Sequence, residues 1–125
     1  MNKVTLDLLE KLEQAANQAN PDMAEEVLWL EDERFTEIEY FTPGPIDADG
    51  VRNIHAWIRE NGTPGENVKF VDIQQYQLTP EVLYATAIQE LNFDEPSKSR
   101  VSFIFLKKGE QWGIIHAHFS AMPSD

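Results

Sequence analysis

Two histidines near the C-terminus are the residues with the clearest capacity for chemistry. His116 and His118 are two positions apart, and at this spacing two side chains of a β-strand project from the same side. Such a pair can hold a metal ion if a third ligand converges on it. The only other histidine is His55, and no carboxylate stands at a recognisable ligand spacing. We therefore expect hydrogen-bonded histidines, with no metal ion and no other cofactor.

A second candidate strand carries a carboxylate together with an aromatic hydroxyl. Tyr84, Thr86, Ile88 and Glu90 alternate along the chain, so a strand would place them on one face. Glu90 could act as a general acid or base if that face is enclosed, because burial and a nearby imidazolium both shift the pKa of a carboxyl group. The alternative is that Glu90 lies near the strand end and is solvated beside Lys69.

Three further residues are candidates for the same kind of site. Asp72 lies in the apolar and amide-rich segment 68–77, where a half-buried carboxylate could serve as a base, but its facing depends on the length of the turn at Thr79. Trp57 could contribute an apolar wall with a polar handle, although its helical spacing is also typical of a core residue. Ser120 is a ligand-binding candidate only, since no acid stands behind the histidines as a serine nucleophile requires.

The N-terminal half predicts the helices that must support these residues. Apolar residues recur at helical spacing up to Pro21, which ends the first helix and suits the first position of a second one. Aromatic and β-branched residues over 34–41 predict a strand. A third helix, capped by Asp47 or Asp49, is expected to end at Gly62.

The C-terminal half is β in character throughout. Four strands separated by short turns are predicted, at 66–78, 82–93, 99–108 and 111–120. Consecutive strands with short turns form an antiparallel meander. Because helices precede strands and no βαβ alternation is seen, we expect one α+β domain over residues 1–125, with a curved antiparallel sheet packed on N-terminal helices.

The last two predicted strands are apolar on both faces. A two-residue turn at Gly109 and Glu110 places one set of residues on one face: Val101, Phe103, Phe105, Trp112, Ile114, His116 and His118. The opposite face would carry Ile104, Leu106, Ile115, Ala117 and Phe119. Since helices cover only one face of such a sheet, we expect the second face to pair two copies in a homodimer.

Charge and composition exclude several kinds of partner. Ten basic and 22 acidic residues give a net charge of −12, a field that repels phosphate backbones and anionic lipid surfaces. We expect no nucleic acid or membrane partner. There is no cysteine, so disulfides and thiolate chemistry are excluded. The absence of a signal-like or membrane-spanning segment leads us to expect a cytoplasmic protein.

The C-terminal run SRVSFIFLKKGEQWGIIHAHFSAMP resembles the closing hairpin of SnoaL-like proteins and of the calcium/calmodulin-dependent protein kinase II association domain. The likeness rests on a tryptophan after the turn and a His-x-His-x-Ser ending, here Trp112, His116, His118 and Ser120. The segment YATAIQEL at 84–91 is also similar to a strand of that group. The resemblance implies a nuclear transport factor 2-like, or cystatin-like, fold over the whole chain.

Two departures qualify what the resemblance implies. The kinase domain lines its pocket with arginines, and Thr86 and Phe103 stand at two of those positions here, which implies a more apolar pocket. The ending also resembles the His-His-His-Ser-Ser-x-Met-Pro ending of iota-class carbonic anhydrases. In this chain Ala117 and Phe119 replace two polar residues of that ending.

The resemblance implies a ligand cavity between the last strands. Its expected walls are Tyr84, Thr86, Val101, Phe103, His116 and His118, with Glu90 facing the same space. These residues favour a small and largely apolar ligand with one polar handle. Our leading hypothesis is a homodimeric small-molecule-binding protein with acid/base chemistry, its status as an enzyme being open. The alternatives are an iota-carbonic-anhydrase-like enzyme and an assembly module like the kinase association domain.

Overall fold

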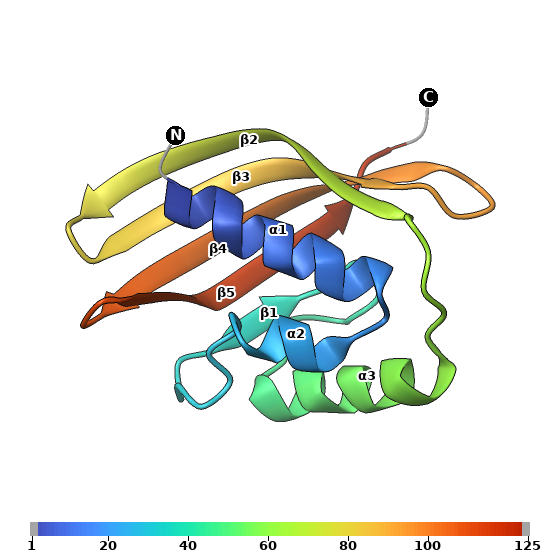
Figure 1. Ribbon diagram of the computed structural model, residues 1–125, viewed down its shortest axis with the longest axis horizontal. Coiled ribbons are helices and arrows are strands. Elements are labelled where there is room, and N and C mark those ends of the chain that lie inside the picture. Colours follow the sequence, from blue (N-terminus) through green and yellow to red (C-terminus); the bar gives the residue numbers. More distant parts are fainter. Residues whose placement is uncertain (1–2, 124–125) are drawn as a thin grey trace.

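The computed structural model describes residues 3–123, which form three helices and one five-stranded sheet (Figure 1). In chain order the elements are α1 (Lys3–Asn17), α2 (Pro21–Glu25), β1 (Thr36–Ile38), α3 (Ala48–Asn61), β2 (Val68–Thr79), β3 (Val82–Leu91), β4 (Ser97–Lys108) and β5 (Gln111–Ala121). Helix α1 lies across one face of the sheet, and α2 and α3 pack beside it near β1. The expected α+β class is confirmed.

The sheet is mixed, with strand order β1-β5-β4-β3-β2. Strands β2 to β5 form the predicted antiparallel meander. Strand β1 runs parallel to β5, with Thr36 beside His116, so one edge of the sheet departs from the antiparallel expectation. The strand predicted over 34–41 is shorter than expected, because a turn closed by the Thr42 hydroxyl follows it.

Local signals set the ends of the helices. Pro21 occupies the first turn of α2, where its missing N–H group removes no helical hydrogen bond. The Asp47 side chain accepts a hydrogen bond of 3.0 Å from the Gly50 amide and caps α3. Helix α3 ends at Asn61, as predicted from Gly62. No helix within residues 3–123 is both long enough and apolar enough to span a bilayer.

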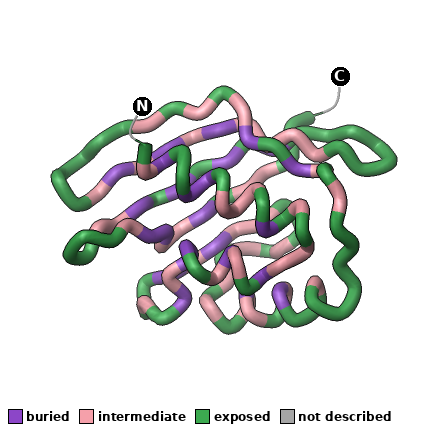
Figure 2. The backbone as a smooth tube through the Cα atoms, in the orientation of Figure 1, coloured by how far each residue is buried: buried purple, intermediate pink, exposed green. Residues whose placement is uncertain are grey.

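The core lies between the sheet and the helices. Its largest fully buried side chains are Phe35, Phe103, Phe105, Leu9, Leu83 and Ile114. Figure 2 shows buried positions of β3 and β4 alternating with positions that are intermediate or exposed, as expected for a sheet with one covered face. We call this covered side the inner face and the opposite side the outer face. Phe103 lies at the centre, with edge-to-face contacts to Phe70 and Phe119.

A one-residue β-bulge in β5 changes the face that its second half presents. Ile104 pairs with His116 but Phe105 pairs with Ile114, so Ile115 is an extra residue. Up to Ile114 the predicted facing is correct. Beyond the bulge it is wrong: Ala117 and Phe119 point to the inner face, and the two histidines point to the outer face.

The segment that precedes β1 holds the bulged strand in place. The Trp29 amide donates to the Ile114 carbonyl at 2.9 Å, and the Ile114 amide donates to the Val27 carbonyl at 2.8 Å. The Trp29 ring covers Gly113, where an added Cβ would lie 1.9 Å from the ring. Lys108 lies 4.8 Å from the centre of the same ring. This docking therefore requires a residue without a side chain at position 113.

We predict that Gly113→Ala lowers the free energy of unfolding by about 2–3 kcal/mol, because the Trp29 ring must move to admit a methyl group. Chemical denaturation measures the change. The matched control is Gly44→Ala, where nothing lies within 4 Å of an added Cβ. Equal effects of the two substitutions would contradict the proposed packing.

Candidate functional site

The structure does not bring the predicted cavity walls together. Val101 and Phe103 are buried on the inner face, against the helices. The other four predicted walls, Tyr84, Thr86, His116 and His118, lie on the outer face, on β3 and β5, with β4 between these two strands. The expectation that all six enclose one cavity is wrong, because the bulge at Ile115 turns the histidines away from Phe103.

The two histidines are therefore outer-face groups. His116 Nδ1 lies 2.8 Å from the Thr36 hydroxyl, and the ring is partly buried. Burial lowers the pKa of His116, and the neighbouring His118 lowers it further. His118 itself is exposed. Within residues 3–123 no group of three or more His, Asp or Glu side chains is arranged to hold a metal ion.

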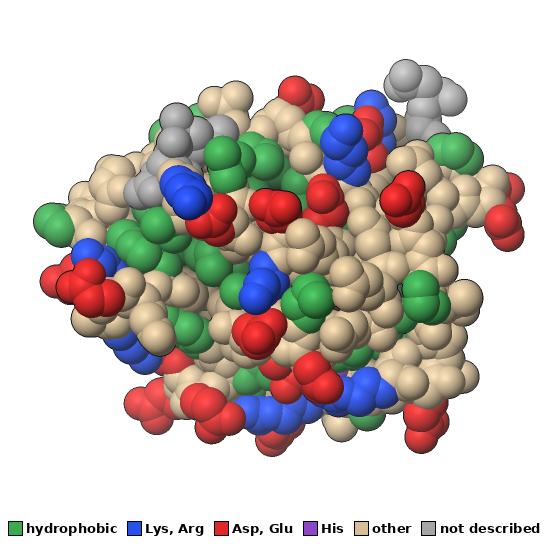
Figure 3. Space-filling view, in the orientation of Figure 1, with side chains coloured by type: hydrophobic (Ala, Val, Ile, Leu, Met, Phe, Trp, Pro, Cys, Tyr) green, Lys and Arg blue, Asp and Glu red, His purple; other side chains and the backbone are tan. Residues whose placement is uncertain are grey.

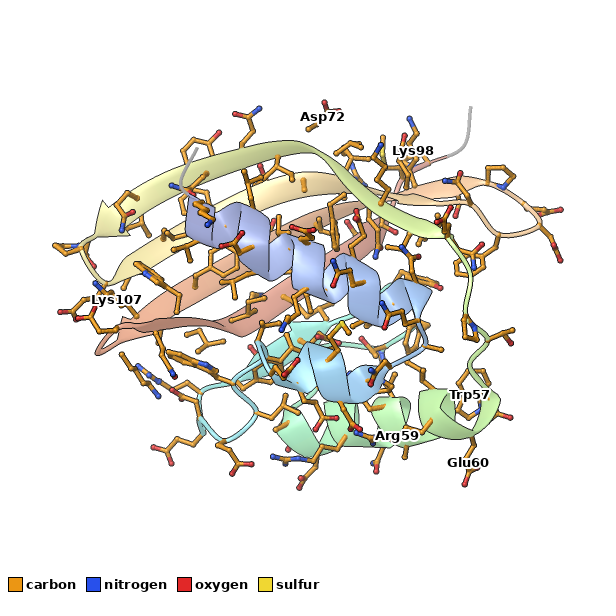
Figure 4. The ribbon with its side chains drawn as sticks, viewed as in Figure 1. Trp57, Arg59, Glu60, Asp72, Lys98 and Lys107 are labelled. Atoms are coloured by element: carbon orange, nitrogen blue, oxygen red, sulfur yellow. The ribbon has the colours of Figure 1, made fainter. Side chains whose placement is uncertain are left out.

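The predicted acids are also outside any enclosed site. Glu90 lies between Lys69 of β2 and Lys98 of β4 in the strand register, which matches the solvated alternative. Asp72 is exposed at a second bulge with a φ of 52°, so the half-buried base expected there is wrong. Figure 4 shows Asp72 pointing away from the sheet beyond β2.

The remaining candidates lie apart from one another. Trp57 is 64% exposed near the end of α3 (Figure 4). It therefore forms neither an apolar wall of the site nor part of the core, the two roles considered for it from the sequence. Ser120 pairs with Arg100 near the end of β5 and is partly buried. His55 is buried on α3, where its Nδ1 lies 2.7 Å from a Glu25 carboxylate oxygen that also binds Arg59. This network joins α3 to α2.

Two carboxyl groups that the sequence analysis did not select occupy the inner face instead. Glu37 is 7% exposed and lies directly beside Ala117 of β5. Its backbone N–H and C=O groups both bond to Ile46, at 2.9 and 2.8 Å, which fixes the direction of the strand. Glu39, two residues further on, turns to the same side and remains partly exposed. Glu39 thus gives the buried pair a route to solvent.

The pKa values of both carboxyl groups are raised. Burial raises the pKa of Glu37 above its usual value, and burial together with the Glu37 charge raises the pKa of Glu39 further. The Glu39 carboxyl group donates a hydrogen bond to the Glu37 carboxylate. Within residues 3–123 no basic side chain forms an ion pair with either one. One group is therefore a proton donor and the other an acceptor in the same apolar setting.

A sequence signal for this pair did exist. In the run RFTEIEYF the acids occupy alternate positions in register with Phe35, which is buried. Alternation with Phe35 would have placed Glu37 and Glu39 on the core side of the strand. This signal is weak for two reasons. Acidic residues are usually solvated, and the burial of Glu37 depends on the pairing of β1 with β5, which lies eighty residues further along the chain.

Two surface hollows lie beside the loop that follows α2. The larger has a volume of about 390 Å³ and is lined by Trp29, Arg52 and Lys108, among others. The smaller, of about 190 Å³, adjoins Phe35 and the start of α3. The cations of the larger hollow are already paired with Asp32, Glu31 and Asp49. Neither hollow contains a predicted wall residue or the Glu37–Glu39 pair.

Comparison with known proteins establishes the fold. A nuclear transport factor 2-like protein of unknown function from Pseudomonas putida is 13% identical with a TM-score of 0.80, and the match covers 97% of this chain and 85% of that one. A similar protein from Shewanella oneidensis is 16% identical with a TM-score of 0.76, covering 94% and 97%. The association domain of C. elegans calcium/calmodulin-dependent protein kinase II is 15% identical with a TM-score of 0.66, covering 94% and 90%.

These likenesses show that the chain has the nuclear transport factor 2-like, or cystatin-like, fold. The suspected resemblance is thus confirmed at the level of the fold. No family model matches the chain. No curated protein matches it either.

We predict that the buried pair makes the protein less stable as the pH rises. Between the ordinary glutamate pKa of 4.5 and the raised values, the folded chain binds more protons than the unfolded chain, so the free energy of unfolding falls with pH. The double variant Glu37→Gln/Glu39→Gln lacks this loss. It should match wild type near pH 5 and exceed it by about 1–3 kcal/mol near pH 9.

Denaturant titrations at several pH values provide the test. The control is Glu81→Gln/Glu110→Gln, which makes the same change in net charge at two exposed positions. Parallel pH profiles for wild type and the Glu37/Glu39 variant would show that the two carboxyl groups titrate normally.

Proposed function

We propose that the protein binds a small molecule on the inner face of its sheet and exchanges a proton with it through Glu37 and Glu39. The observation that carries this proposal is a pair of neighbouring carboxyl groups, one of them 7% exposed, that has no basic partner within residues 3–123 and whose pKa values are raised by burial. A structural role is a poor explanation for such a pair, because burying an uncompensated carboxylate costs several kcal/mol.

The surroundings of the pair favour the ligand class that the sequence analysis suggested. Phe35, Ala117 and Phe119 are apolar neighbours on the same face, and the carboxyl groups can hydrogen-bond to the polar handle of a ligand. A largely apolar molecule bearing a carbonyl group could accept a hydrogen bond from protonated Glu39, while Glu37 removes a proton from the adjacent carbon. The general acid and base chemistry that the sequence analysis suggested for Glu90 and the histidines is thus proposed for Glu37 and Glu39 instead.

The alternative of an iota-carbonic-anhydrase-like enzyme has less support. It depended on the His116 and His118 ending, and these histidines lie on the opposite face of the sheet from Glu37 and Glu39. The alternative of an assembly module is compatible with the likeness to the kinase association domain. Such a module would use the outer face of the sheet to contact other copies of the chain.

We predict that carbonyl ligands bind beside the pair and exchange a proton there. In a screen of small cyclic ketones, amide shifts of isotope-labelled protein should cluster at Glu37, Glu39 and Ala117. Deuterium exchange at the carbon next to the ligand carbonyl should fall about 10²–10⁴-fold in Glu37→Gln, with binding nearly unchanged. The control variant Glu81→Gln/Glu110→Gln should behave as wild type. Shifts confined to the outer face around Thr86 would refute the location.

We also propose that the outer face pairs two copies of the chain, as the sequence analysis expected. The residues that support this pairing differ from those first chosen, since Ala117 and Phe119 are internal. Ile104 is 36% exposed at the centre of the outer face, beside Tyr84, whose ring stacks on that of Tyr76 at 4.7 Å. No other element within the described residues 3–123 covers these groups.

We predict that Ile104→Lys weakens this pairing at least about tenfold, because the ammonium group would lose water without gaining a partner. Sedimentation equilibrium gives the dissociation constant. Ile104→Thr, which keeps a β-branched and uncharged side chain, is the matched control and should weaken pairing less. A wild-type protein that is monomeric at about 100 μM would rule out the outer-face dimer.

A further inference from the structure

The sheet has two edges, and one of them is closed. At the edge formed by β1, Glu37 exchanges both of its outward backbone hydrogen bonds with Ile46, at 2.9 and 2.8 Å. No long row of free N–H and C=O groups is left there, since β1 has only three residues. An edge that is short and covered in this way does not recruit another strand.

The first part of the other edge, formed by β2, is closed by side chains of α1. Asn17 accepts hydrogen bonds from the Asn67 and Val68 amides and donates one to the Val68 carbonyl at 3.0 Å. Glu13 accepts a hydrogen bond of 2.8 Å from the Phe70 amide. Beyond Phe70, the bulge places Asp72 outside the edge, and its exposed carboxylate disfavours strand pairing at that point (Figure 4).

The remainder of β2, which we call the open edge, runs from Gln74 to Leu78. Within residues 3–123 its backbone forms no hydrogen bond to any element except β3 and the following turn. Four of its five residues are exposed, and Leu78 is 61% exposed. Figure 1 shows this half of β2 along the free border of the sheet. It therefore presents unpaired donors and acceptors to an incoming strand.

The open edge carries no charged side chain, although the chain is strongly acidic. Residues 73–80 read IQQYQLTP and contain no charge, whereas the chain as a whole has a net charge of −12. On the helix-covered side of the molecule, acidic and basic side chains are spread over most of the surface (Figure 3). Exposed edge strands normally carry a lysine, a proline or an inward charge that prevents pairing. Between Asp72 and Pro80 the open edge has none of these.

We propose that the open edge pairs with the open edge of a second copy, antiparallel across a two-fold axis, and joins two sheets into one. A second copy fits better than a charged peptide because the segment offers no charge to complement. Two chains of net charge −12 repel one another least where the facing segments are neutral. In an antiparallel arrangement centred on Tyr76, Gln74 faces Leu78 and Gln75 faces Gln77 of the other strand, and Asp72 and Glu81 lie at the ends.

This contact differs from the outer-face pairing and adds to it. A strand pair of five residues buries less surface than a stable interface requires, so the edge contact is weak by itself. Two contacts on different surfaces together give species larger than a dimer. Because the net charges repel, added salt should strengthen the edge contact.

The test uses charge at two exposed glutamines of the open edge. Gln74→Glu/Gln77→Glu places carboxylates along both edges, which should weaken the edge contact about tenfold. Gln74→Lys/Gln77→Lys should weaken it in the same way. A mixture of the two variants should restore assembly, because each acidic edge then meets a basic one. Native mass spectrometry of isotope-labelled variants shows the mixed species directly.

The matched control is Gln18→Glu/Gln111→Glu, which adds the same charge at exposed positions away from the edge. Wild type and control should form species larger than a dimer at about 100 μM, and each edge variant alone should not. Three results would overturn the proposal: a wild type no larger than a dimer, edge variants that assemble like the control, or a mixture of acidic and basic variants that does not recover assembly.

Discussion

The pairing of β5 with its neighbours is the constraint on which the rest of the molecule depends. One extra residue, Ile115, shifts the second half of the strand so that Ala117 and Phe119 enter the core and the two histidines leave it. The docking of Trp29 on Gly113, with backbone bonds to Ile114, lies immediately before that residue. Beyond the bulge β5 pairs with β1, and this pairing carries Glu37 to the inner face.

The buried carboxyl pair is where the sequence departs most clearly from the needs of stability. Glu37, on the short strand between β5 and Ile46, and Glu39, just after that strand, oppose folding at neutral pH, since water solvates a carboxylate better than Ala117 or Phe119 can. The interaction of the Glu39 carboxyl group with the Glu37 carboxylate lowers this cost without removing it, since the pKa values of both groups stay raised. Local conflicts of this kind are found mainly where a protein uses the groups concerned.

Much of the fold could be predicted because its signals are local. Pro21, Asp47 and Gly62 mark helix ends through backbone rules that need no distant partner, and Gly109 with a φ of 62° marks the hairpin turn. The alternating pattern also gave the correct facing of β4 and of β5 as far as Ile114.

The candidate site could not be predicted in the same way. Its position depends on contacts between residues far apart in sequence. The bulge at Ile115 lies next to the docking site of Trp29. The burial of Glu37 results from its pairing with Ala117 and its backbone hydrogen bonds to Ile46. Period-two alternation contains no information on where an extra residue interrupts it. Acids within a strand also suggest a solvated face, which is correct for Asp72 and Glu90 and incorrect for Glu37.

The central claim is that Glu37 and Glu39 hold one proton between them inside the protein. A carbon-13 titration of the glutamate side-chain carboxyl groups, assigned with the Glu37→Gln and Glu39→Gln variants, measures this directly. We predict that one carboxyl group of the pair remains protonated at pH 7 and that the titration of each changes when the other is replaced. Two independent transitions near pH 4.5, like those of exposed glutamates, would contradict the account.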